Sequence, residues 1–251
     1  MTAPSYHLNR ISAQSFGSAS ALYDQYRPSP PQTLIEDLVA LAPSDVLDIG
    51  CGTGKVAVEF MERGMRVLGV EIDERMADHA REHGVPVEIA SFESWDAKGR
   101  QFDLITCADA WHWIDPARGS ENAAAVLRPG GTLALFWSFY LLEDDVAARF
   151  QRVYDEHAPQ AMTHSYEPLQ ANGDPFEPTS AFRPIETRSY RWVETMSAER
   201  WIGLVGTFSD HRALTPQQLG TVQESLHEAF EGLGGNVTVS RGVHAAFAQR
   251  R

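Results

Sequence analysis

Apolar and polar positions follow a regular order between residues 45 and 137. Short apolar runs predict buried strands at 45–49, 66–71, 85–90, 102–107 and 131–137. Between them, apolar residues recur at helical spacing over 53–63, 74–83 and 115–127. Alternating strands and helices predict an α/β fold, a mostly parallel sheet with helices on both faces.

The pattern changes on both sides of this block. Upstream, helices are expected over 13–26 and 31–41, with Pro28 and Pro30 between them. Downstream, a helix is expected over 143–158, followed by an irregular stretch over 159–184 and a strand over 185–193. Two further helices are expected over 197–207 and 215–231, and a last strand over 237–249. This organisation gives an N-terminal helical cap at 1–43 and a core at 44–138. A mainly helical elaboration with one strand follows at 139–235, and a C-terminal strand at 236–251 completes the sheet.

Composition narrows the classes of function. The chain is 43% hydrophobic and 22% charged, which suits a folded domain, and its net charge of −13 argues against a nucleic-acid partner. We expect a cytoplasmic protein without a membrane partner, because no long apolar run and no signal pattern occur. Cys51 and Cys107 suggest neither a disulfide framework nor a zinc site, so no metal is expected.

Three glycines at spacing two, Gly50, Gly52 and Gly54, directly follow the first core strand. Glycine permits a sharp turn and close approach to a ligand, and the next helix offers its N-terminal amides. A phosphate-binding P-loop requires GxxxxGK[ST], which this loop lacks, and Val56 replaces the hydroxyl that would bind magnesium. A dinucleotide loop would read GxGxxG, and a carboxylate at Asp48 would oppose its pyrophosphate.

Asp48 instead favours an adenosine ligand that carries an ammonium group. Glu71 ends the second core strand, where a carboxylate can accept hydrogen bonds from both ribose hydroxyls. Asp73 is a second candidate for that role, although its position favours capping the next helix.

The chain resembles the class I S-adenosylmethionine (SAM)-dependent methyltransferases of the UbiE and trans-aconitate methyltransferase kind (methyltransferase type 11). The resemblance rests on DIGCGTGK, GVEID, FDLITCADAWHW and LRPGG, and on the upstream YDQYRP. It is strongest over 44–138. It implies a Rossmann-like fold with a seven-stranded sheet, a helical insertion after the fifth strand, SAM as cofactor and S-adenosylhomocysteine as product.

The resemblance also implies a set of cofactor-binding residues. Arg27 would bind the SAM carboxylate, Ser91 and Phe92 would border adenine, and Ala108 would lie beside the methionine portion. Glu93 would either accept from the adenine amino group or face solvent. The full set is Tyr26, Arg27, Asp48, Gly50, Cys51, Gly52, Gly54, Glu71, Ile72, Ser91, Phe92, Glu93 and Ala108.

Methyl transfer from a sulfonium requires alignment of the acceptor, and a general base only if the acceptor loses a proton. His112, just after the fourth strand, is the candidate base, or a residue that shapes the pocket. The acceptor pocket is expected to draw on aromatic residues, which could equally pack as core. They are Phe16, Tyr23, Trp111, Trp113, Trp137, Phe139, Trp201 and Phe208.

These features predict methylation of a small aromatic or apolar metabolite by a monomer or homodimer. O-methylation is favoured, with N- or C-methylation, a protein substrate and non-catalytic SAM binding as alternatives. The [ND]PP[YFW] tetrapeptide of many nucleic-acid methyltransferases is absent after the fourth strand. The identity of the acceptor does not follow from the sequence.

Overall fold

The computed structural model describes residues 16–165 and 180–251. At its centre is a seven-stranded sheet in the order β3-β2-β1-β4-β5-β7-β6. The strands are β1 (Asp45–Ile49), β2 (Arg66–Glu71), β3 (Val87–Ile89), β4 (Phe102–Ala108), β5 (Leu127–Leu142), β6 (Glu186–Ser197) and β7 (Asn236–Gln249). The first five pair in parallel, and β7 runs antiparallel to β5 and β6. The expected mostly parallel sheet is confirmed.

Helices cover both faces of this sheet. One face packs on α3 (Gln32–Val39), α4 (Lys55–Met61) and α5 (Glu74–Glu82) through a core that includes Leu38, Phe60 and Ala80. The other face packs on the 3₁₀ turn η3 (Trp111–Trp113) and α6 (Pro116–Val126). Asp115 caps α6 as expected, since its side chain accepts from the Arg118 N–H.

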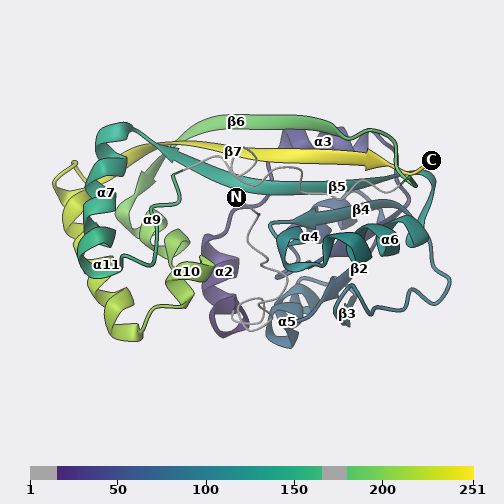
Figure 1. The fold of residues 1–251 in the computed structure, drawn as a ribbon, viewed down its shortest axis with the longest axis horizontal. Coiled ribbons are helices and arrows are strands. Elements are labelled where there is room, and N and C mark those ends of the chain that lie inside the picture. Colours follow the sequence, from purple (N-terminus) through teal and green to yellow (C-terminus); the bar gives the residue numbers. More distant parts are fainter. Residues whose placement is uncertain (1–15, 166–179) are drawn as a thin grey trace.

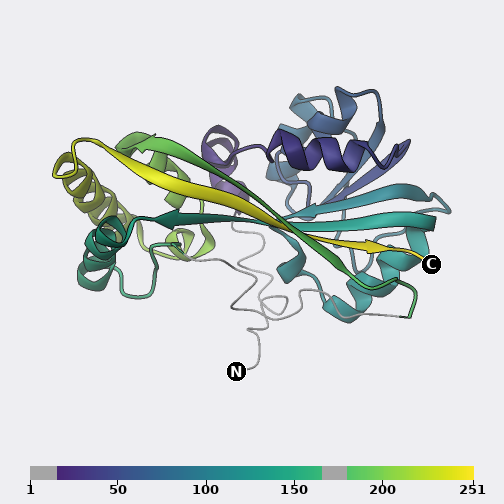
Figure 2. The ribbon, with the colours of Figure 1, turned by 90° about the horizontal axis from the view of Figure 1, so that it is seen from above.

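The last three strands extend far beyond the core (Figures 1 and 2). Their far ends pack on a helical lobe with its own hydrophobic core, in which Phe150, Trp201 and Phe230 are fully buried. The lobe consists of α7 (Asp144–His157), α9 (Ala198–Val205), α10 (Ser209–Arg212) and α11 (Pro216–Glu231). A capping box at Thr215 and Gln218 begins α11.

The N-terminal segment lies between the core and the lobe. It contains η2 (Phe16–Ala19) and α2 (Ser20–Tyr26), and α2 contacts both α5 and α9. On the core side, Asp24 pairs with Lys55 at 3.4 Å. On the lobe side, Arg212 Nη2 donates to Ser18 Oγ at 2.6 Å. The described part of the cap therefore joins the two halves of the molecule.

Several elements differ in extent from those expected. The fifth strand, expected over 131–137, runs from Leu127 to Leu142 because β7 pairs with it as far as Leu142, so it crosses the boundary expected after residue 138. The sixth, expected over 185–193, continues to Ser197 for the same reason. The fourth helix begins at Lys55 rather than 53, because Gly54 has a left-handed φ of +86°. Part of the helix expected over 13–26 and of the irregular stretch over 159–184 lies outside the described residues.

Within 16–165 and 180–251, no helix combines the length and the apolar character needed to cross a membrane.

Candidate functional site

The glycine loop turns sharply at the carboxyl end of β1. Gly50, Gly52 and Gly54 all adopt positive φ, at +60°, +56° and +86°. A Cβ on Gly50 would lie only 2.7 Å from the Ala110 Cβ, so a side chain there meets both steric conflict and backbone strain. Position 50 therefore requires glycine, both for its positive φ and for the space beside Ala110.

Asp48 lies beneath this loop as a buried carboxylate with one oxygen satisfied. Thr106 Oγ1 donates to its Oδ1 at 2.7 Å. No described residue makes a full hydrogen bond to the other oxygen, Oδ2, although the Ala57 N–H at the start of α4 favours the ionised carboxylate, and the side chain is almost fully buried. Burial, together with the nearby Glu71, raises the pKa of Asp48 to about 7. A cationic ligand group would relieve this cost, which matches the ammonium group expected from the sequence.

Glu71 ties the end of β2 to the glycine loop. Its Oε2 accepts from Gly52 N at 2.9 Å, and its Oε1 accepts from Ile72 N at 2.8 Å and Asp73 N at 2.9 Å. A carboxylate has about four acceptor positions, so these bonds leave one on Oε2 for a ligand hydroxyl. Burial raises the Glu71 pKa. Asp73 caps α5 by accepting from Arg75 N, as its position suggested.

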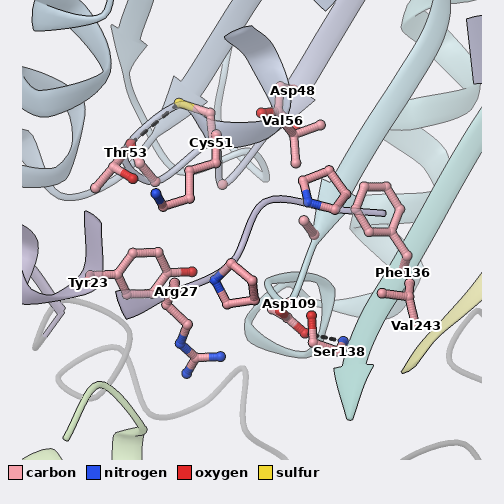
Figure 3. Close-up of a pocket in the computed structure, with 16 residues that line it drawn as sticks. Tyr23, Arg27, Asp48, Cys51, Thr53, Val56, Asp109, Phe136, Ser138 and Val243 are labelled. Atoms are coloured by element: carbon pink, nitrogen blue, oxygen red, sulfur yellow. Dashed lines mark hydrogen bonds between the residues drawn. The ribbon is translucent and has the colours of Figure 1, made fainter. Parts of the chain in front are cut away.

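A pocket lies between the glycine loop and the N-terminal segment (Figure 3). In this view Tyr23 lies across the pocket from the loop, whereas the Arg27 side chain points away from the loop. The lining residues are Tyr23, Arg27, Pro28, Pro30, Asp48, Gly50, Cys51, Gly52, Thr53, Lys55, Val56, Ala108, Asp109, Phe136, Ser138 and Val243. The pocket therefore combines the carboxyl edge of the sheet with a segment that precedes the core in sequence.

Arg27 extends from this pocket toward the lobe. Its Nε donates to Thr207 Oγ1 at 2.8 Å, and its guanidinium lies over the rings of Phe208 and Tyr23. Tyr26 turns the other way, packs against Gly203 of α9 and donates to Glu199 Oε1 at 3.4 Å. Of the two aromatic residues of α2 that the sequence singled out, Tyr23 lines the pocket and Tyr26 anchors the helix to the lobe.

Asp109 is a pocket residue that the sequence analysis missed. It has a left-handed φ of +50°, its Oδ1 accepts from Ser138 N at 2.8 Å, and burial raises its pKa. Its position directly after β4, at the same edge of the sheet as Asp48 and Glu71, was the available signal. A second acid therefore faces the pocket beside Asp48.

The segment expected to border adenine lies beside α6. Phe92 is buried in the core on that face, and Ser91 Oγ donates to Glu93. Glu93 also accepts from Asp115 N at 3.3 Å. Ile72 is partly buried next to Glu71, while Gly54 packs against α5. None of these residues lines the pocket described above, whereas Gly50, Cys51, Gly52 and Ala108 do.

His112 lies on η3, with its ring 4.9 Å from that of Trp113, and remains accessible to solvent. The surrounding protein and then the Arg27 charge lower the His112 pKa to about 4. The imidazole is therefore neutral near pH 7 and has a lone pair for a proton, although it is a weak base.

Most aromatic candidates for the acceptor pocket pack in hydrophobic cores. Trp111 and Trp137 belong to the core beside α6, and Trp201 belongs to the lobe core. Phe139 covers Gly242 and stacks on His244 at 4.6 Å, because successive strand residues face opposite ways and Ser138 faces the pocket. Phe208 is largely buried but touches Arg27, Trp113 is partly buried, and the Phe16 side chain lies outside the described part.

Both cysteines are free thiols and buried, as expected. Burial raises the pKa of each well above its ordinary value, so neither is a thiolate at neutral pH. Cys51 contributes to the pocket wall, and Cys107 lies in the core beside α6.

Residues 46–131 match the model of a methyltransferase domain. An uncharacterized methyltransferase of Mycobacterium bovis is 41% identical over 127 residues, which cover 49% of this chain and 52% of that protein. A ubiquinone biosynthesis O-methyltransferase of Coxiella burnetii is 33% identical over 106 residues, covering 39% of this chain and 45% of the relative. The chain thus spans about half the length of these curated relatives.

Solved structures share the fold over a longer stretch. A structure assigned as a type II methyltransferase from Anaeromyxobacter dehalogenans has a TM-score of 0.66 at 23% identity, covering 88% of this chain and 97% of that one. Phosphoethanolamine N-methyltransferase 2 of Haemonchus contortus, solved with S-adenosylhomocysteine, has a TM-score of 0.53 at 16% identity, covering 96% of this chain and 58% of that one. Residues 46–131 therefore belong to the methyltransferase domain family, and most of the chain shares its fold with solved methyltransferase structures.

Proposed function

We propose that the protein binds SAM between the glycine loop and the N-terminal segment and transfers its methyl group to a small molecule. The observation that carries this proposal is Asp48, a buried carboxylate at the pocket whose Oδ2 accepts no full hydrogen bond from any described residue. Ionising a buried carboxyl group whose oxygen lacks a full hydrogen-bond partner costs free energy unless a cation binds next to it. The ammonium group of SAM is such a cation.

The other pocket residues fit the same ligand. SAM carries a carboxylate besides its cationic groups, and Arg27 supplies the complementary charge at the pocket wall. Asp109 adds a second carboxylate for the positive end. Glu71 keeps one acceptor position for a ribose hydroxyl, beside the backbone of Ile72. Ser91, Phe92 and Glu93 would complete the adenine end next to α6.

When bound, SAM supplies an activated methyl group on a cationic sulfur. The protein has to hold the acceptor in line with that methyl and exclude water. Such positioning accounts for roughly 7–11 kcal/mol of rate enhancement in favourable cases. Tyr23 and Arg27 line the same pocket as the glycine loop, so the segment that carries them is suited to this enclosing role.

We assign the acceptor site to the lobe side of this pocket, formed by the described parts of the N-terminal segment and of residues 139–235. Phe208 offers a flat apolar surface beside Arg27 and Tyr23, which favours a small aromatic or apolar acceptor. A net charge of −13 disfavours nucleic acid as the substrate.

O-methylation is the favoured reaction, with His112 as the candidate base. A neutral imidazole with a pKa of about 4 is too weak to deprotonate an ordinary alcohol, so it favours an acceptor whose O–H is already acidic, such as a phenol. A carboxylic acid is already ionised at neutral pH and would accept the methyl group without a base. The pocket carboxylates Asp48 and Asp109 give a specific reason to test amine acceptors as the second candidate class.

Calorimetry with S-adenosylhomocysteine tests the cofactor half of the proposal. The full chain should bind one equivalent, and Gly50→Ala should abolish binding through strain and contact with Ala110. Gly64→Ala is the matched control, since Gly64 also has positive φ (+81°) but nothing lies within 4 Å of its Cβ position. An absence of binding by the wild-type protein would reject the proposal.

A mass-shift screen tests the acceptor half. The protein and SAM are incubated with phenols, carboxylic acids and amines, and products heavier by one methyl group are sought. Product from a phenol or acid supports the favoured reaction, and product from amines alone moves the assignment to N-methylation. Tight S-adenosylhomocysteine binding with no product from any class would indicate a non-catalytic SAM-binding protein or a macromolecular substrate.

A further inference from the structure

Three side chains with metal-ligating atoms converge in the helical lobe. His164 lies after α7, and Asp210 and His211 lie in α10, with all their ligand atoms within 4.8 Å of one another. His164 Nε2 is 2.8 Å from both carboxylate oxygens of Asp210, and His211 Nδ1 is 2.9 Å from Oδ1. Both imidazoles therefore point at the same carboxylate oxygen.

We propose that this cluster binds one zinc ion through His164 Nε2, the Asp210 carboxylate and His211 Nδ1. Two imidazoles and a carboxylate are ligands that zinc accepts, and a fourth position remains for water or another oxygen ligand. In a tetrahedral site with bonds of about 2.0–2.2 Å, neighbouring ligand atoms lie roughly 3.3 Å apart. The His–Asp contacts at 2.8 and 2.9 Å would open by about 0.4–0.5 Å, and the two histidine nitrogens, within 4.8 Å of each other, would take up a similar spacing.

The groups around the cluster orient its ligands. Asp210 accepts backbone hydrogen bonds from Met162 N at 3.1 Å and His211 N at 2.9 Å, which fix the direction of the carboxylate. On the far side of the His211 ring, Nε2 lies 3.0 Å from the Tyr154 hydroxyl. Partners of this kind are typical outside zinc-binding histidines, because they fix the ring orientation and tautomer.

Access to the cluster comes from one side. His211 is fully buried, whereas the side chains of His164 and Asp210 are 17% and 19% exposed. A cation approaching that side meets a carboxylate between two imidazoles. The site therefore combines a buried supporting side with an open entry side, as a binding site for an exchangeable ion requires.

The position of the cluster indicates what the ion would do. His164 stacks at 4.1 Å on Phe208, the ring that also carries the Arg27 guanidinium. Next to His164, Ser165 Oγ accepts from Leu142 N at 2.9 Å, at the end of β5. A zinc ion would hold this segment against α10 and thereby fix the lobe wall nearest the pocket. This role does not depend on the proposed methyl transfer.

Zinc chloride itself is the probe. The full chain, freed of metal with a chelator, is titrated by calorimetry, and bound zinc is counted by elemental mass spectrometry. We expect one zinc per chain. Asp210→Asn and His164→Gln should abolish saturable binding, and Tyr154→Phe should weaken it roughly 10–100-fold, since it removes only the outer hydroxyl. His227→Gln, an exposed histidine of α11, should bind as the wild type does.

The competing state is a hydrogen-bonded triad that holds no ion, in which Asp210 accepts from both imidazoles. Wild-type protein without saturable zinc binding, or affinity unchanged by Asp210→Asn and His164→Gln, would establish that state and overturn the proposal. Circular dichroism checks the fold of each variant. If the ligand variants fail to fold, Tyr154→Phe decides, because it keeps the packed ring. S-adenosylhomocysteine binding, measured on the same samples, reports separately on the cofactor proposal.

Discussion

The guanidinium of Arg27 lies 4.4 Å from the centre of the Phe208 ring. Arg27 also lines the pocket at the glycine loop, whereas Phe208 belongs to the core of the helical lobe. The contact therefore joins the proposed cofactor site to the wall of the proposed acceptor site. Changes on either side of it should affect the other.

Replacement of Arg27 tests this connection. Arg27→Ala should weaken S-adenosylhomocysteine binding roughly 10–100-fold, because a charged hydrogen bond contributes about 1.5–3 kcal/mol. The affinity of Arg27→Lys should lie between those of the wild type and Arg27→Ala, since lysine keeps the charge but loses the planar stack on the aromatic rings and the hydrogen bond to Thr207. Calorimetry measures the affinity of both variants, with Arg63→Ala, an exposed arginine just after α4, as control. Wild-type affinity in Arg27→Ala would remove Arg27 from the site.

Gly203 determines how closely α2 approaches the lobe. A Cβ there would overlap the ring of Tyr26, so Gly203→Ala should displace α2 and lower the free energy of unfolding by about 1–3 kcal/mol. S-adenosylhomocysteine affinity should fall as well, because Tyr23 lies in α2 and Arg27 directly after it, so a displacement of the helix moves both pocket residues. Gly220→Ala in α11 meets nothing within 4 Å and should instead stabilise the protein by about 0.5–1 kcal/mol. Urea unfolding distinguishes the two, and equal stabilities would contradict the packing argument.

Asp48 should make cofactor binding depend on pH. Its pKa is about 7 without ligand, and the proposed ammonium contact needs the ionised form. Below pH 7 the proton must leave on binding, so S-adenosylhomocysteine affinity should fall up to tenfold per pH unit between about pH 7 and 5. Calorimetry in buffers of different ionisation enthalpy should detect proton release near pH 6. Asp48→Asn should bind weakly at pH 8 and show a flatter profile; a steep profile in this variant would assign the proton elsewhere.

The same shift predicts a stability change in the ligand-free protein. The pKa of Asp48 is raised from 3.8 to about 7 by folding, so its stabilising contribution is complete below pH 4 and is lost as pH rises to about 7. The slope should reach about 1.4 kcal/mol per pH unit in that window. Urea unfolding at pH 5 and 8 measures this change in the free energy of unfolding. Asp48→Asn should lack the part of the pH dependence that comes from Asp48. Identical pH dependence in the two proteins would show that burial does not perturb Asp48.

His112 should act on turnover rather than on cofactor binding. With an acceptor from the screen, His112→Gln should lower kcat about 10²–10⁴-fold if the imidazole takes a proton, and leave S-adenosylhomocysteine affinity unchanged. Because its pKa is lowered to about 4, His112 stays neutral above pH 5, and kcat at saturating SAM should show no loss from its protonation between pH 8 and 5. Unchanged kcat in the variant would leave His112 with a role in pocket shape alone.

The order of strands and helices in the core follows from local pattern. Apolar runs and helical spacing place β1 and β2 at their observed bounds, because burial of one face imposes its period on the residues. The glycine loop was equally readable, since three left-handed positions favour glycine independently of distant contacts. Asp48 and Glu71 could be placed because both lie at the carboxyl ends of parallel strands, Asp48 one residue before the last of β1, and these ends meet at one edge of the sheet.

The tertiary structure alone decides which side chains share a surface. Trp201 and Phe139 read as pocket residues in sequence but pack inside, because strand alternation and the lobe core turn them away from the pocket. His164 and Asp210, 46 residues apart, meet through the packing of the lobe, and no local period records that contact. The sequence by itself therefore determined the order of core strands and helices and the glycine loop, which depend on local backbone geometry and burial. The acceptor-side wall depends on packing between segments far apart in the chain.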